Sequence, residues 1–250
     1  MLVRLAAIGL AAGLFGAILG VGGGIVVVPL LVYLFAYDQR QAAATSMGAI
    51  AITATVGAIA YAIQGHQHPA EAALLGVPAG FGVVAGTAIQ QRMPLRALQL
   101  VFGGFLVVVA IRLLAPEALP FHAVDHRAWW VYAACLGIGL LGGVLAGLFG
   151  VGGGILFVPT FVLLLGLPQL DAGATSLLAM LPASFIGAWR QSRYGNLDRH
   201  ASVVIGLVSI AGVGGGIAIA ERLPEPTLRS IFGAFLLLTA AQITWRASRR

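Results

Sequence analysis

One short stretch of this chain occurs twice, and both copies interrupt apolar sequence. The first copy reads Gly-Val-Gly-Gly-Gly-Ile-Val-Val-Val-Pro from Gly20 to Pro29, and the second reads Gly-Val-Gly-Gly-Gly-Ile-Leu-Phe-Val-Pro from Gly150 to Pro159. Each such glycine weakens a helix by about 1 kcal/mol relative to alanine, and the run leaves backbone N–H groups available. Inside a bilayer, such backbone persists only where it is packed in protein or lines a wet cavity. We therefore expect a helix break at each copy, followed by a restarted helix.

The composition places these breaks in a membrane. The chain is 60% hydrophobic and 9% charged, which is far from the composition of a soluble domain. Apolar runs of about 20 residues, long enough to span a bilayer, recur along the whole length. We therefore predict an all-α polytopic membrane protein. The apolar run after Arg4 imitates a signal peptide, but it lacks a convincing cleavage site, so we expect it to be retained.

Matches at a single register predict that the chain is internally duplicated. The ungapped shift that carries Gly20 to Gly150 carries Thr45-Ser46 onto Thr175-Ser176. At the same register it matches Gly57 to Gly187, Gly65 to Gly195, Gly76 to Gly206, Gly82 to Gly212, Gly86 to Gly216, Arg92 to Arg222, Pro94 to Pro224 and Phe102-Gly103 to Phe232-Gly233. So many matches at one register indicate two homologous halves. We place the first half at residues 1–115, a connecting loop at 116–128 and the second half at 129–250.

Each half is expected to contain five apolar pieces, which makes about 8 to 10 membrane segments with a broken first helix in each half. The pieces fall at about 2–19, 24–36, 42–63, 72–90 and 95–114, and again at 129–149, 154–166, 172–189, 201–220 and 227–245. If each glycine stretch reverses the chain, ten of the fourteen basic residues share the side of the N-terminus, namely Arg4, Arg40, Arg92, Arg96, Arg190, Arg193, Arg199, Arg246, Arg249 and Arg250. If each broken first helix instead crosses the membrane once, the fourteen arginines divide nine to five between the two sides. The positive-inside rule therefore favours chain reversal, inverted repeats, and both termini in the cytoplasm of a multi-pass inner-membrane protein.

The glycine breaks are the first candidate binding residues. An oxyanion in a low-dielectric cavity needs hydrogen-bond donors, and free amides at a helix N-terminus supply them together with the positive end of the helix dipole. The alternative is that the glycines only allow close helix packing. The candidate substrate-binding glycines are Gly22, Gly23, Gly24, Gly152, Gly153 and Gly154.

Hydroxyl groups supply a second set of candidates. They follow Asp38 and Asp171, which we expect to act as helix N-caps, and they are candidates to complete an anion shell from both halves. Alternatively, each hydroxyl bonds back to a carbonyl of its own helix. These residues are Thr45, Ser46, Thr175 and Ser176.

Three more residues are placed near the predicted site. Pro29 and Pro159 lie in the restarted helices, where we expect them to bend the helix without touching a ligand. Arg190 ends an apolar piece beside Trp189, so it either meets an anion at a cavity mouth or anchors the helix at the lipid headgroups.

Several classes of function are excluded or disfavoured. All fourteen basic residues are arginine, and together they form no basic stripe, so we expect no lysine chemistry and no nucleic-acid binding despite the net charge of +6.

Cys135 is the only cysteine, and the histidine pairs His66-x-His68 and His122-x-x-x-His126 lack nearby ligands, so we expect no metal and no cofactor. Neither Ser46 nor Ser176 lies in a G-x-S-x-G context, so we do not expect an enzyme. All carboxylates lie in connections or at segment ends, which disfavours a cation permease and a mid-membrane proton relay.

With these motifs the chain resembles the sulfite exporter family, the TauE/SafE-type permeases, over essentially its full length. The features that carry the resemblance are both glycine stretches with their prolines, Ala44-Thr45-Ser46, Ala174-Thr175-Ser176, and Tyr194-Gly195-Asn196-Leu197-Asp198. The first half departs from the pattern, with Gly65-His66-Gln67-His68-Pro69 in place of the last motif. The resemblance implies an inner-membrane permease for sulfite, sulfonates or related sulfur-containing anions, often moved outward. The alternatives are a permease for another small ion or metabolite, and a membrane-embedded enzyme.

Overall fold

The computed structural model describes residues 1–19, 22–114 and 129–220, together with isolated positions between Ser230 and Ile243. The regular secondary structure of these residues is α-helical. The helices are α1 (Leu2–Leu19), α2 (Gly24–Leu34), α3 (Gln39–Ile63), α4 (Pro69–Arg92), α5 (Leu95–Leu114), α6 (Trp129–Phe149), α7 (Gly154–Leu163), α8 (Gln169–Arg193) and α9 (Arg199–Ala220). Each apolar piece predicted up to residue 220 thus coincides with a helix. The predicted loop at 116–128 and most of the piece at 227–245 lie outside the described residues.

Within the described residues, four helices are long and apolar enough to cross a bilayer. They are Gln39–Ile63 (α3), Pro69–Arg92 (α4), Trp129–Phe149 (α6) and Leu170–Arg193 (α8), and the shorter apolar helices pack around them. Large apolar side chains face outward along them, as expected for helices in contact with lipid; Phe81 of α4 is 71% exposed and Phe185 of α8 is 55% exposed. The polytopic, all-α prediction is therefore confirmed.

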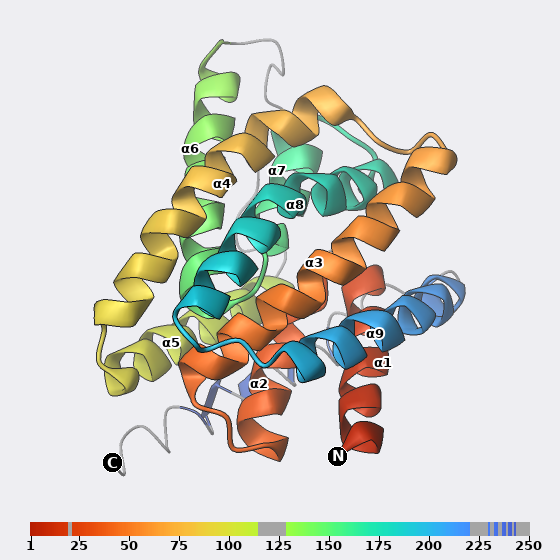
Figure 1. Cartoon of the computed structure of the whole chain (residues 1–250). Coiled ribbons are helices and arrows are strands. Elements are labelled where there is room, and N and C mark those ends of the chain that lie inside the picture. The colour runs from red at the N-terminus through yellow and green to blue at the C-terminus, as the bar shows by residue number, and fades with distance from the viewer. Residues whose placement is uncertain are drawn as a thin grey trace.

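The chain reverses at both glycine breaks. Gly23 returns to the backbone of Ala12 in α1, and Gly153 lies beside Gly142 of α6, so α2 and α7 each turn back beside the helix before them. The turn requires glycine because Gly22, Gly23, Gly152 and Gly153 have φ of 70°, 75°, 79° and 84°, a left-handed conformation that other residues rarely adopt. Figure 1 shows α1 rising from the N-terminus and α6 descending from the opposite end of the bundle, so that the two breaks meet at its centre.

Small residues let helices that are far apart in the sequence approach closely. Helix α1 packs along α9, and α6 packs along α4. A Cβ atom on Gly13 would lie 2.0 Å from the Ser209 carbonyl oxygen, and one on Gly143 would lie 2.1 Å from the Ala79 carbonyl oxygen. Such backbone contact is how membrane helices gain van der Waals packing where no hydrophobic driving force acts between them.

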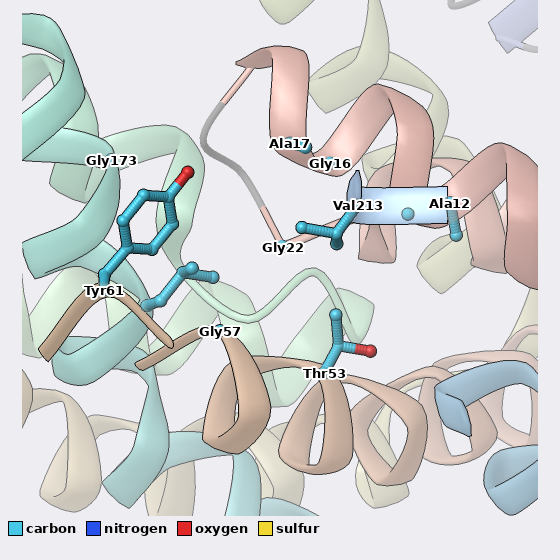
Figure 2. Close-up of a pocket in the computed structure, with 11 residues that line it drawn as sticks. Ala12, Gly16, Ala17, Gly22, Thr53, Gly57, Tyr61, Gly173 and Val213 are labelled. Atoms are coloured by element: carbon cyan, nitrogen blue, oxygen red, sulfur yellow. The ribbon is translucent and has the colours of Figure 1, made fainter. Parts of the chain in front are cut away.

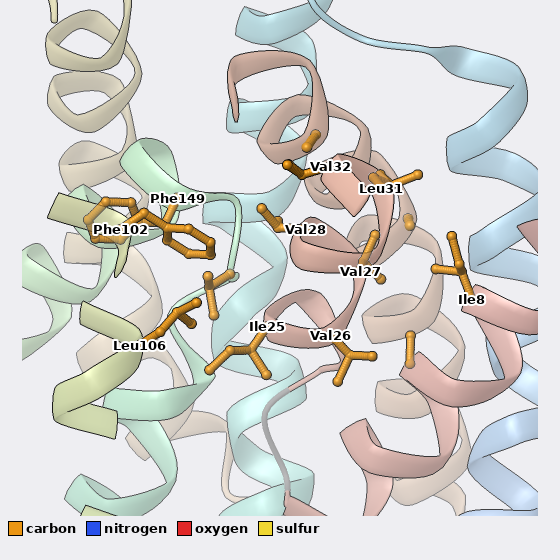
Figure 3. Packing of buried hydrophobic residues seen from close by; sticks show 14 of the residues in the cluster. Ile8, Ile25, Val26, Val27, Val28, Leu31, Val32, Phe102, Leu106 and Phe149 are labelled. Atoms are coloured by element: carbon orange, nitrogen blue, oxygen red, sulfur yellow. The ribbon is translucent and has the colours of Figure 1, made fainter. Parts of the chain in front are cut away.

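The apolar core holds the restarted helix α2 in place. Figure 3 shows its valines and Leu31 packed against Ile8 of α1 on one side, with Phe102 and Phe149 nearby on the other. The rings of Phe102 and Phe149 lie 5.3 Å apart. Because α2 is buried between α1 and α5, the first break is fixed relative to the rest of the bundle.

The predicted helix caps are half right. Asp38 caps α3, since its Oδ1 accepts the Gln41 amide at 2.8 Å. The prediction for Asp171 is wrong: Pro168 precedes α8, and Asp171 lies within the first turn, where its carboxylate faces His66 instead. Asp198 caps α9 in the way that Asp38 caps α3, since its Oδ1 accepts the Ala201 amide at the start of α9.

Candidate functional site

The two glycine breaks converge on the side chains of Ile50 (α3) and Met180 (α8). A Cβ on Gly22 would lie 2.6 Å from Met180 Cε, and one on Gly152 would lie 2.3 Å from the same atom. A Cβ on Gly24 would lie 2.5 Å from Ile50 Cδ1 and 2.8 Å from the Gly150 carbonyl oxygen. The six predicted glycines are all buried, and three of them, Gly22, Gly24 and Gly152, meet at the Ile50 and Met180 side chains.

The amides of these glycines have no hydrogen-bond acceptor among the described residues. Helices α2 and α7 begin at Gly24 and Gly154, and neither has a side-chain cap. The carbonyls of Gly23 and Gly153 accept the first helical hydrogen bonds, but no acceptor for the six glycine amides is found within the described part of the chain. Two helix N-termini with buried, unpartnered N–H groups thus lie side by side, an arrangement suited to an anion.

The space between the breaks is filled in this structure. Met180 Cε and Ile50 Cδ1 both lie close to the glycine backbone, as the distances above show, and both residues are at most 1% exposed. Methionine is flexible and adapts to irregular space. A bound anion would therefore require the Met180 side chain to move.

The predicted hydroxyls divide into two kinds. Ser46 lies at the second break, where its Oγ donates to the Gly150 carbonyl oxygen at 2.7 Å, and Ser176 Oγ lies 3.8 Å from Met180 Sδ. The two threonines instead hold loops: Thr45 Oγ1 accepts the Asp198 amide at 3.3 Å, and Thr175 Oγ1 accepts the His68 amide at 3.2 Å. The serines therefore belong with the breaks, whereas the threonines tie the α8–α9 and α3–α4 loops to the bundle.

Comparison with known proteins identifies this arrangement. The model of the sulfite exporter TauE/SafE family matches residues 5–243, which include both glycine breaks and the helices around them. The chain belongs to the sulfite exporter TauE/SafE family. The prediction of family membership is confirmed.

Relatives of this TauE/SafE family member carry transporter names. The chain is 28% identical to a probable membrane transporter protein of Xylella fastidiosa, with 96% of this chain and 92% of the relative covered. It is also 28% identical to the probable membrane transporter protein YunE of Bacillus subtilis, with 97% of each chain covered. The family and these relatives support a multi-pass membrane permease, consistent with the expectation that the protein is not an enzyme.

In this TauE/SafE protein, the Arg190 side chain bonds to α4 and to the residue that ends α8. Its Nε donates to Thr87 Oγ1 at 2.8 Å and its Nη2 to the Tyr194 hydroxyl at 2.8 Å. The guanidinium therefore links the C-terminal parts of α4 and α8. The helix-break residues Pro29 and Pro159 lie inside α2 and α7, as predicted.

Beside Arg190 lies a polar cluster that sequence reasoning missed, which we name the glutamine cluster: Gln90, Gln91, Gln191 and Asn196. Gln90 and Gln191 are 0% exposed, and Gln191 Nε2 donates to Gln90 Oε1. Gln90 Nε2 donates to the Leu148 carbonyl oxygen at 2.6 Å, and Asn196 Nδ2 to Gln191 Oε1 at 2.9 Å. The cluster therefore joins α4, α6 and α8 on the side of the breaks nearer the α8–α9 loop. Amides near the ends of two apolar helices are the only signal in the sequence that points to it.

A cavity of about 30 Å³ lies on the other side of the first break, between α1 and α3. Figure 2 shows Tyr61 and Thr53 of α3 on one wall, with Gly22, Gly16 and Ala17 opposite them. Its volume suits about one or two waters rather than an oxyanion. Of the predicted site residues, the cavity is lined by Gly22 alone.

Charged groups lie at helix ends. The carboxylates Asp38, Glu71, Asp171 and Asp198 all stand in or next to the first turn of a helix, and within the described ranges no cluster of His, Cys, Asp or Glu has the makings of a metal site. In the α8–α9 loop, Asp198 Oδ2 accepts the Tyr37 hydroxyl at 2.5 Å. Burial, with help from that carboxylate, raises the pKa of Tyr37 to about 12. Burial would raise the pKa of Asp198, but the Ala201 amide, the Tyr37 hydroxyl and nearby His200 outweigh it and lower that pKa.

Proposed function

We propose that this protein is a secondary permease for small sulfur-containing anions such as sulfite or sulfonates, and that the anion binds between the two glycine breaks. The observation that carries the proposal is the convergence of two helix N-termini whose buried glycine amides have no acceptor among the described residues. A desolvated oxyanion needs several donors, and paired N-termini add favourable dipoles without a full positive charge that would hold the anion too tightly to release.

The proposed binding residues are Gly22, Gly23 and Gly24 with Gly152, Gly153 and Gly154, supported by Ser46 and Ser176. Ser46 acts here by holding the Gly150 carbonyl, which keeps that acceptor turned away from a negative ligand. Thr45 and Thr175 belong to the proposed shell as well, because their hydroxyl oxygens accept loop amides and their O–H groups remain available as donors.

We also propose that the two halves are inverted repeats. The shift that carries Gly20 to Gly150 relates contacts as well as residues. A Cβ added to Gly76 would lie 2.7 Å from the Ala179 carbonyl oxygen, and one added to Gly206 would lie 3.1 Å from the Ala49 carbonyl oxygen. The opposite directions of α1 and α6 in Figure 1 support the inversion. In such folds the substrate site lies near the midplane between the repeats. We further propose that both termini are cytoplasmic and that the protein lies in the inner membrane.

No carboxylate lies mid-helix in the described residues, so the mechanism we propose needs no central proton relay. An inside-negative membrane potential favours exit of an anion by about 2.3 kcal/mol per charge per 100 mV. Export down this gradient is therefore the simplest mode of action.

The test is transport of labelled sulfite in proteoliposomes at several imposed potentials, with a sulfonate and a panel of cations as competitors. We expect sulfite flux that follows the potential, is inhibited by the sulfonate and is unaffected by the cations. Flux of a cation with no flux of either anion would refute the proposal. Flux of a different small anion alone would keep the glycine site and replace the substrate, which is the second candidate function.

A further inference from the structure

The cavity between α1 and α3 carries an inference that rests on the proposed function. Its walls include Ala12, Gly16 and Ala17 of α1 and Thr53, Gly57 and Tyr61 of α3. It reaches Gly22, whose amide has no acceptor among the described residues. The cavity therefore meets the first break at one of the proposed anion donors.

Tyr61 supplies a polar group at the outer end of the cavity. It lies in the last turn of α3, close to Ile63, which is 82% exposed. The Tyr61 hydroxyl has no hydrogen-bond partner in the part of the chain that the structure describes. Figure 2 shows its ring rising from α3 across from the Gly22 loop. A free hydroxyl at this point is available to donate to a passing anion.

Polar residues frame this end of the cavity. Gly173, on the cavity wall, is close in sequence to Asp171, whose Oδ1 lies 2.9 Å from His66 Nδ1 and whose Oδ2 lies 3.5 Å from His68 Nε2. The α3–α4 loop and the start of α8 therefore meet beside the mouth, where water has access to polar groups.

The corresponding path on the other side of the breaks is packed. The shift that relates the halves carries Gly57 to Gly187, Tyr61 to Gln191 and Met47 to Leu177. Met47 is 0% exposed and its Cε would lie only 1.9 Å from a Cβ on Gly187. Gln191 is buried and bonded within the glutamine cluster, whereas Tyr61 is half-buried and its hydroxyl has no partner among the described residues. The two sides thus differ at each of these positions.

We propose that the cavity beside Tyr61 is the anion's access route to the glycine breaks, and that the glutamine cluster closes the opposite route in this conformation. Most of the wall residues are glycine or alanine, so a separation of α1 from α3 widens the cavity without moving large side chains. The Tyr61 hydroxyl is a ligand contact on the route, which adds a residue to the site that the glycines and serines do not include.

The experiment compares two single cysteines at positions related by the shift, Leu177→Cys on the cavity wall and Met47→Cys on the packed side. Both are made in a Cys135→Ala background, because Cys135 is the only native cysteine. The full-length protein in proteoliposomes is treated with an anionic methanethiosulfonate. We expect modification of Leu177→Cys to be at least about tenfold faster and to be slowed by sulfite. Equal rates, or faster modification of Met47→Cys, would overturn the one-sided route.

A second variant tests the ligand contact. Tyr61→Phe keeps the ring and removes the hydroxyl, so we expect the KM for sulfite to rise several-fold while the thermal midpoint stays unchanged. Tyr132→Phe, at an exposed tyrosine of α6, is the matched control and should transport like the parent protein. An unchanged KM in Tyr61→Phe would remove the hydroxyl from the route. The labelling rates need no transport, so a protein that fails to move sulfite but labels on one side refutes the proposed substrate and leaves the route intact.

Discussion

Gly22 and Gly152, one from each helix break, face the same methyl group, Met180 Cε. A Cβ atom added to Gly22 would lie 2.6 Å from this carbon, and one added to Gly152 would lie 2.3 Å from it. This shared contact places two left-handed glycines, two helix N-termini and one flexible side chain at a single point. The Met180 side chain therefore occupies the place of the proposed anion, and glycine is required there for conformation and for space.

We expect Gly22→Ala and Gly152→Ala each to lower sulfite flux by about tenfold or more. The added methyl meets Met180 and also forces alanine into left-handed backbone, which costs about 1–2 kcal/mol. Flux in proteoliposomes and the thermal midpoint in detergent are the measurements.

Gly195→Ala separates these two effects. Gly195 has φ +76°, yet a Cβ there meets nothing within 4 Å, so only the backbone strain remains. We expect it to lower the thermal midpoint slightly and to leave flux nearly intact. If Gly195→Ala impaired flux as much as Gly22→Ala, strain alone would explain the result and the shared site at Met180 would lose its support.

The serines should contribute unequally. Ser46→Ala removes the hydrogen bond to the Gly150 carbonyl, whose net value is about 1 kcal/mol, so we expect flux to fall by roughly fivefold. Adding Ser176→Ala should lower flux further by a smaller factor. Ser184→Ala is the control, because Ser184 is equally buried on α8 but bonds only to its own helix. Unchanged flux in the double variant would exclude both hydroxyls from the site.

Replacing the polar side chain of Gln39 with an apolar one should stabilise the fold. Its side chain is 0% exposed, and neither its nitrogen nor its oxygen has a hydrogen-bond partner in the described part of the chain. A buried unpartnered amide costs about 1–3 kcal/mol, so Gln39→Leu should raise the thermal midpoint. Gln90→Leu should lower it, because Gln90 is equally buried but fully engaged in the glutamine cluster. A fall in both variants would show that Gln39 is already satisfied.

The positions of the helices follow from the sequence, because apolar runs bounded by Asp38, the α3–α4 loop and the glycine stretches leave few other ways to satisfy the backbone in lipid. The convergence of the breaks was also foreseeable, since a repeat with its own break predicts two that meet between the halves. The hydrogen-bond partners that side chains find across the bundle could not be foreseen from the sequence. Thr45 and Thr175 were predicted as ligands, and that stays a prediction; the structure adds that their hydroxyls accept loop amides far away in the sequence, which no local pattern reveals.

The polar residues missed by sequence reasoning share a cause. Gln90 and Gln191 stand near the ends of long apolar helices, where a glutamine ordinarily meets lipid headgroups or water, and only the three-dimensional packing turns them toward each other. Asp171 illustrates the same limit: its position near a helix start suggests a cap, yet Pro168 begins the turn and the carboxylate is left to pair with His66.

The contact between Tyr37 and Asp198 predicts how stability depends on pH. The folded pKa of Tyr37 is raised from 10.0 to about 12, so its contribution is fully present below pH 10 and is lost as the pH rises toward 12. The folded pKa of Asp198 is lowered, so its contribution is present above the carboxylate's ordinary pKa and is lost as the pH falls through the folded value. Thermal midpoints should therefore fall at both extremes. Tyr37→Phe should remove the part of the fall in thermal midpoint at alkaline pH that comes from this pair. Because Asp198 then loses one hydrogen-bond donor, the fall in thermal midpoint at acid pH should begin at a higher pH. Tyr33→Phe, one helical turn earlier in α2, is the control, and an identical pH profile for both variants would show that the Tyr37–Asp198 contact does not govern either limb.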